Sequence, residues 1–129
     1  METKELKNTI ETIYKIQMAA VKVIEANEDY IIAKKAHESV TYDWTHKDQD
    51  NNNLWSSLTD KMYQKEGQLK KAVNNFFKVA GHPEKVQKWE LGYSAVLEYN
   101  RFIEDSYLFS NISNLIPKFS LYDCRARKY

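Results

Sequence analysis

The stretch LKNTIETIYKIQMAAVKVIEANEDYIIAKKAHESVTYDW, residues 6–44, has apolar side chains at every third or fourth position. This spacing places side chains on one face of an α-helix. One such line of residues continues through most of the stretch: Ile16, Ala19, Val23, Ala26, Tyr30, Ala33, His37, Val40 and Trp44. No glycine or proline occurs before Gly67. We therefore predict one long helix over residues 3–46, with a break near Asn27 as the alternative.

Two further helices are expected after the polar run THKDQDNNN, residues 45–53, which is typical of a loop. Apolar periodicity resumes over residues 53–80 and again over residues 83–109. Between them, Gly81 suits the position after a helix end, and Pro83 suits a first helical turn. These signals predict a tight antiparallel hairpin of the second and third helices, followed by a short docked tail over residues 111–129.

The composition supports an all-α fold. Apolar residues make up 43% of the chain, and only three glycines and two prolines occur in 129 residues. Few helix breakers and a helical apolar period favour helices throughout. We predict a single domain, residues 1–129, built as an antiparallel bundle of three long helices, or four if the first breaks near Asn27.

The charge balance argues against general electrostatic binding to nucleic acid. The formal net charge is +1 and the isoelectric point is about 7.8, whereas nucleic-acid-binding domains are typically more basic. The alternative is kept open because basic residues cluster near the expected turn between the second and third helices and at the tail. They are Lys70, Lys71, Lys78, Lys85, Lys88, Arg125, Arg127 and Lys128.

The chain lacks the usual signals for export or for membranes. Its first residues, METKELKNTIETIY, contain no apolar core of a signal peptide. No apolar run approaches the ~20 residues needed to span a bilayer. Cys124 is the only cysteine, so no intrachain disulfide can form. We expect a soluble, cytoplasmic protein that does not bind membranes.

Motifs that would indicate catalysis or metal binding are incomplete. Asp48-x-Asp50-x-Asn52 resembles the opening of a calcium loop, but Asn53 stands where that loop needs glycine and Thr59 where it needs glutamate. The three histidines are not spaced as a helical metal pair. We therefore expect no metal, no cofactor and no enzymatic activity. Catalysis by scattered carboxylates remains the open alternative.

The aromatic residues allow two interpretations. Nine tyrosines, five phenylalanines and three tryptophans either fill the core or include exposed residues that bind a partner, because tyrosine and tryptophan are enriched at interfaces. The third expected helix is apolar around most of its circumference, which is typical of a central helix or one shared with a partner. The candidates for partner binding are Tyr99, Phe102, Phe109 and Tyr122, and the first three are also the candidates for a homodimer interface.

These observations favour a non-catalytic protein–protein interaction module, either a small adaptor or an inhibitor that sequesters a target protein. The abundance of Lys, Asn, Ile and Tyr is typical of AT-rich coding sequences, so a phage- or plasmid-encoded antagonist is one form of this hypothesis. The alternative is an accessory nucleic-acid-binding protein that uses the basic residues named above.

Overall fold

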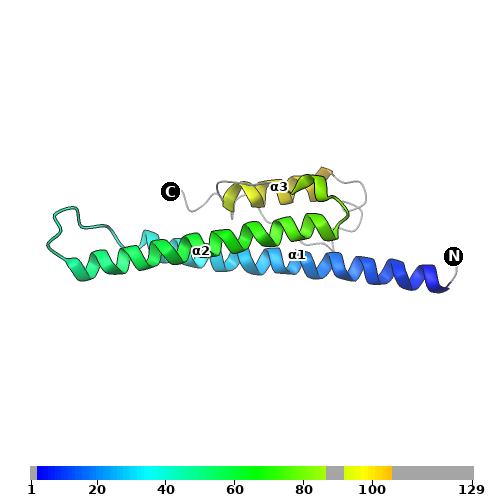
Figure 1. Ribbon diagram of the computed structural model, residues 1–129, viewed down its shortest axis with the longest axis horizontal. Helices are drawn as coiled ribbons and strands as arrows, with labels where there is room; N and C mark the ends of the chain where they lie inside the picture. Colours follow the sequence, from blue (N-terminus) through cyan, green and yellow to red (C-terminus); the bar gives the residue numbers. More distant parts are fainter. Residues whose placement is uncertain (1–2, 87–91, 106–129) are drawn as a thin grey trace.

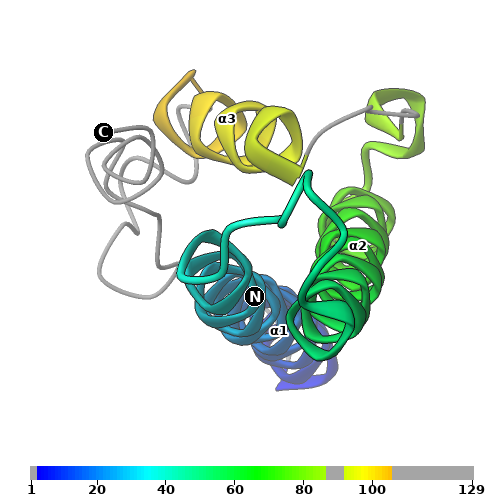
Figure 2. The same ribbon diagram turned by 90° about the vertical axis from the view of Figure 1, so that its left-hand side faces the viewer.

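The computed structural model describes residues 3–86 and 92–105 (Figure 1). These residues form helices joined by loops and contain no strand, which confirms the all-α prediction for this part of the chain. The elements are α1 (Thr3–Glu38), α2 (Gln49–Val79), the 3₁₀-helix η1 (Pro83–Lys85) and α3 (Gly92–Asp105). Seen from one end, the three α-helices surround a common centre (Figure 2).

Helix α1 is continuous through Asn27, whose side chain is buried against the bundle. The helix ends at Glu38, however, and the predicted continuation to residue 46 is wrong. In the last turn the Ser39 amide donates to the carbonyls of Lys35 and Ala36, and its hydroxyl donates to Ala36 as well. The following run of Ser, Val and Thr has low helix propensity. The chain therefore leaves the helix there, and residues 39–48 form the loop.

Helix α2 begins at Gln49, four residues before the predicted start at residue 53. Asp48 is its N-cap, because the Asp48 carboxylate accepts a hydrogen bond from the Asn51 amide at 3.0 Å. The polar residues that indicated a loop are therefore partly the first turns of a helix. Helix propensity alone does not reveal this, because asparagine and aspartate favour both loops and helix starts.

The end of α2 follows the prediction closely. Gly81 has a φ of 84°, a left-handed conformation that favours glycine. The Gly81 amide donates to the Lys78 carbonyl at 3.1 Å, and the His82 amide donates to the Phe77 carbonyl at 2.8 Å. This pair of bonds is the Schellman motif, which satisfies carbonyls at a helix end. Local capping chemistry therefore terminates α2.

The predicted third helix, residues 83–109, is wrong at its start. Pro83 opens only the short η1, and Val86 is extended with ψ of 125°. Helix α3 begins at Gly92 and is described to Asp105. The remainder of the prediction, including residues 106–109 and the docked tail over residues 111–129, lies outside the described residues.

Helices α1 and α2 run in opposite directions along each other (Figure 1). The His37 ring near the end of α1 lies 5.3 Å from the Trp55 ring near the start of α2. Tyr30, earlier in α1, hydrogen-bonds to Glu66, later in α2. Burial, followed by this Glu66 carboxylate, raises the pKa of the Tyr30 hydroxyl to about 12.

Helix α3 instead runs in the same direction as α2. The Tyr99 ring lies 4.8 Å from Phe76, while the Phe102 ring, one turn later, lies 5.4 Å from Phe77. Phe102 also lies 5.0 Å from the His82 ring beyond the end of α2. The predicted antiparallel hairpin of the second and third helices does not fit these contacts, and a wholly antiparallel bundle is not confirmed.

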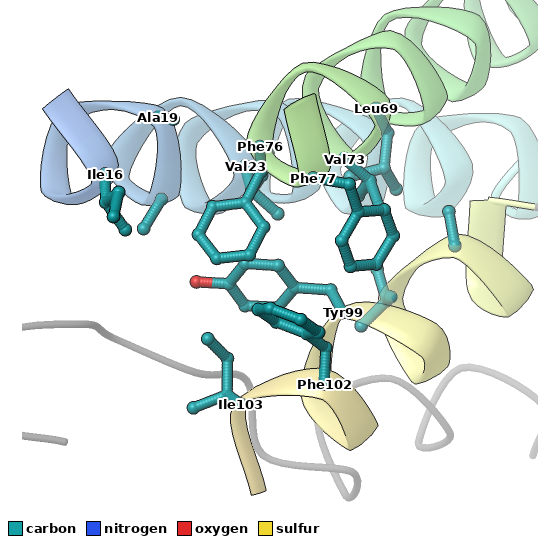
Figure 3. Close-up of a cluster of buried hydrophobic side chains, with 13 residues drawn as sticks. Ile16, Ala19, Val23, Leu69, Val73, Phe76, Phe77, Tyr99, Phe102 and Ile103 are labelled. Atoms are coloured by element: carbon teal, nitrogen blue, oxygen red, sulfur yellow. The ribbon is translucent and has the colours of Figure 1, made fainter. Parts of the chain in front are cut away.

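The core lies where the three helices meet (Figure 3). Phe76, Tyr99 and Phe102 pack edge to face there, an arrangement that aromatic rings prefer. Ala19 and Ala20 are buried on α1, where small side chains permit close helix packing. The buried apolar residues are Ile16, Ala19, Ala20, Val23, Leu69, Val73, Phe76, Phe77, Ala95, Val96, Tyr99, Phe102 and Ile103.

Candidate protein-binding surface at the loop between α1 and α2

The loop of residues 39–48 presents an exposed tryptophan. The Trp44 side chain is 81% exposed, the largest exposed fraction among the large apolar residues described. Its ring packs on Tyr42 at 4.7 Å, and Tyr42 in turn lies 5.0 Å from Trp55 of α2. A series of aromatic contacts therefore leads from the surface of the bundle to the tip of the loop.

The Asp43 carboxylate holds the loop together from within. It accepts hydrogen bonds from the Thr45 hydroxyl and amide and from the amides of Lys47 and Asp48, with the three amide bonds between 2.9 and 3.1 Å. These donors, led by the Thr45 hydroxyl, lower the pKa of Asp43 to about 2. The loop conformation therefore depends on an ionised Asp43.

Two asparagines of α2 fasten the loop to the helix. The Asn52 amide pairs with the Asp43 backbone, accepting from its N–H at 2.7 Å and donating to its carbonyl at 2.9 Å. The Asn51 side chain donates to the Thr41 carbonyl at 2.8 Å. Hydrogen bonds thus restrain the loop backbone beside Trp44, and the indole packs on Tyr42.

Two residues of the incomplete Asp48-x-Asp50-x-Asn52 pattern and two of the three histidines take part in this structure. Asp48 caps α2 and Asn52 bonds to the loop, so both side chains already have partners. The His37 ring packs on Trp55, and its buried Nε2 makes no hydrogen bond to the described residues. His46 adopts a φ of 59° and lies 5.8 Å from Tyr42. Within the described residues, no group of three potential ligands is placed to hold a metal ion.

The predicted partner-binding residues are not at this loop. Tyr99 is fully buried and Phe102 is only 7% exposed, so the exposure on which their predicted role depended is absent. They are core residues, because Tyr99 and Phe102 pack against Phe76 and Phe77 of α2. Phe109 and Tyr122 lie outside the described residues.

Sequence reasoning missed Trp44 as an exposed residue, because its position fitted the apolar line of the first helix. One signal could have indicated the loop: Ser39-Val40-Thr41 is a poor helical run, and it precedes an aspartate followed by threonine two residues later. Aspartate in that setting commonly bonds to nearby backbone amides and turns the chain.

Only some of the predicted basic residues lie within the described part of the chain and are exposed. Lys71, Lys78 and Lys85 are exposed, and the Lys85 ammonium lies 5.8 Å from the centre of the Phe102 ring. Lys70 lies 3.6 Å from Glu66, so its charge is partly balanced. The remaining candidates, Lys88, Arg125, Arg127 and Lys128, lie outside the described residues.

Comparisons with known proteins add no relatives. No family model, curated protein or solved structure matches this chain. Among the described helices, none has a stretch long and apolar enough to cross a bilayer.

Proposed function

We propose that the protein is a non-catalytic protein-binding module, an adaptor or an inhibitor, that engages its target through Trp44. The observation that carries this proposal is the 81% exposure of a tryptophan on a loop restrained by hydrogen bonds. Tryptophan is among the residues that contribute most to binding at protein interfaces.

The restrained loop supports this role energetically. A rigid binding residue loses little conformational freedom on association, so more of its contact energy is available for binding. A buried tryptophan removes roughly 150–250 Å² from water. The complementary feature of the target is an apolar pocket that takes one indole ring, with a polar or acidic group beside it for the exposed side chain of Lys47.

The experiment compares proteins recovered from a lysate of the source cells by immobilised wild-type protein and by Trp44→Ala. A matched control is Tyr63→Ala, which removes another exposed aromatic (60%) from the middle of α2, away from the loop. A genuine target should be retained by wild type and by Tyr63→Ala and lost with Trp44→Ala, with circular dichroism unchanged in all three.

The result has two informative alternatives. Recovery that is the same with Trp44→Ala as with wild type would refute the role of this loop. Recovery of nucleic acid in place of protein would favour the second functional class, binding through the basic residues. An inhibitor and an adaptor are then distinguished by whether the recovered target loses its activity on binding.

A further inference from the structure

The outer face of α1 carries an exposed apolar stripe. Its members, separated by four, four, four and three positions, are Leu6, Ile10, Tyr14, Met18 and Val21, which are 50%, 58%, 60%, 42% and 36% exposed. A helix turns about 100° per residue, so these five lie on one side. We call this set the α1 stripe.

The α1 stripe faces away from the bundle. By the same helical geometry, Val21 lies nearly opposite Val23, which is buried in the core, and Ile10 lies about 120–140° around the helix from the buried Ile16 and Val23. The first turns of α1 also extend past the ends of the other helices (Figure 1). A contiguous exposed apolar face of this kind usually marks an interaction surface.

Charged residues along one edge of the stripe have a particular order. From the N-terminus onward, the first three charged residues on this edge are Lys4 (positive), Lys7 (positive) and Glu11 (negative). From residue 29 back towards the N-terminus, the edge carries Asp29 (negative), Glu25 (negative) and Lys22 (positive), so the two series have opposite charges at each step. All six are exposed, and they occupy the same side of the helix relative to the stripe.

This order fits a second copy of α1 placed antiparallel to the first. Antiparallel helices bring residues from the same edge of each helix together, so Lys4 meets Asp29, Lys7 meets Glu25 and Glu11 meets Lys22. Because the pairing is twofold symmetric, each contact occurs twice. A parallel twofold pair would instead place this edge of one helix against the opposite edge of the other, so these charges would not meet one another.

The apolar residues meet in almost the same register. When Lys7 lies opposite Glu25, Tyr14 lies opposite Met18 and Ile10 lies within one residue of Val21. Both alignments place the twofold axis at the level of residue 16 along the helix. Apolar and charged contacts thus select one arrangement, in which flanking charges determine orientation more than affinity.

We propose that the α1 stripe is a self-association surface, where two copies of this chain pair through antiparallel α1 helices. This interface replaces the α3 face that the sequence predicted for a homodimer, since Tyr99 and Phe102 are buried within one chain. The Trp44 loop is not part of the pairing, so self-association and target binding are tested separately.

The first test measures mass in solution by sedimentation equilibrium over a concentration series. Wild type should be a dimer that dissociates on dilution, whereas Ile10→Asp should be monomeric with an unchanged helical spectrum, because Ile10 is exposed. Leu54→Asp is the matched control: Leu54 is exposed to a similar extent (50%, against 58% for Ile10) but lies on α2, so this variant should dimerise like wild type.

The second test exchanges charges and does not depend on the apolar substitution. Lys7→Glu and Glu25→Lys should each raise the dissociation constant at low salt, and the double variant should restore it. High salt should reduce the differences among the four proteins, since exposed ion pairs are screened.

Three results would overturn the proposal. Wild type could be monomeric at the highest soluble concentration, a dimer could survive Ile10→Asp, or the double charge exchange could fail to restore pairing. If Ile10→Asp lost helix content, the charge exchange alone would decide whether two copies pair through α1. Retained Trp44-dependent target binding by a monomeric wild type would reject self-association and leave the proposed function intact.

Discussion

The side-chain amide of Asn52 pairs with the backbone of Asp43 through two hydrogen bonds, of 2.7 and 2.9 Å. Asn52 is 4% exposed, and the bonded groups lie nine residues apart on a loop and a helix. The amide therefore substitutes for a neighbouring peptide group and satisfies a backbone donor and acceptor that would otherwise lack partners.

Replacing Asn52 with alanine should lower the free energy of unfolding by about 1–3 kcal/mol, the usual cost of leaving buried polar groups unpaired. The neighbouring substitution Asn53→Ala is the control, because Asn53 is exposed and only bonds to Gln49 within the same helix. Its effect should stay within about 0.5 kcal/mol. Urea unfolding measures both, and equal destabilisation by the two substitutions would contradict the role assigned to Asn52.

Acid should loosen the loop between α1 and α2 through Asp43. Because folding lowers the pKa of Asp43 from 3.8 to about 2, the ionised carboxylate stabilises the fold above pH 3.8. This contribution is lost as the pH falls towards 2. Observing the Asp43 carboxyl by NMR during an acid titration should give a midpoint near 2.

Thr45→Val tests the cause of this shift, because the Thr45 hydroxyl is the leading donor to Asp43. Its removal should raise the pKa of Asp43 towards 3.8 without preventing folding. A midpoint that does not move would show that the backbone amides alone account for the lowered pKa.

Replacing each of two glycines in the described region with alanine should change the stability of the protein in opposite directions. Gly67 is inside α2 and an added Cβ would meet nothing within 4 Å, so the surrounding structure has room for a side chain there. Gly67→Ala should raise stability by about 0.5–1 kcal/mol. Gly81→Ala should lower stability by about 1–2 kcal/mol, because a φ of +84° strains an L-residue. Thermal unfolding measures the stability change of each variant. If Gly81→Ala were more stable than wild type, the role of Gly81 in capping α2 would be refuted.

Phe102 should behave as a core residue and not as part of an interface. Phe102→Ala should cost about 3–5 kcal/mol, as for other buried aromatic residues, and Phe102→Asp should prevent folding. Tyr63→Ala, at an exposed position of α2, should change stability by no more than about 0.5 kcal/mol. If Phe102→Asp remained folded with wild-type stability, the packing of α3 described above would be wrong.

Nucleic-acid binding should be weak and sensitive to salt. Lys71 and Lys78 are exposed two turns apart on α2, so the double substitution with glutamine removes two candidate partners of phosphate groups. Removing each such partner should flatten the log–log salt dependence of binding by roughly one unit. Titration with single- and double-stranded DNA at two salt concentrations measures this slope. Submicromolar binding that persists at high salt would favour the nucleic-acid class.

The amino-acid sequence by itself determined the helical class and the end of α2. The 3.6-residue period identified the buried line on α1 from Ile16 to Ala33, and the Gly81 signal located the end of α2. These features depend on interactions within a few residues, namely helical geometry and backbone capping, so local patterns are sufficient to predict them.

Tertiary structure decided where α1 ends, which way α3 runs and which aromatic residues are exposed. A periodic pattern identifies an apolar face but not its partner, so Trp44 matched the line on α1 although the Asn52–Asp43 contact holds it in a loop. Helix α3 is apolar on two adjacent faces, and either direction along α2 would bury them. Contacts between Phe102 and both Phe77 and His82 select one direction, because only packing between distant segments distinguishes arrangements with the same local pattern.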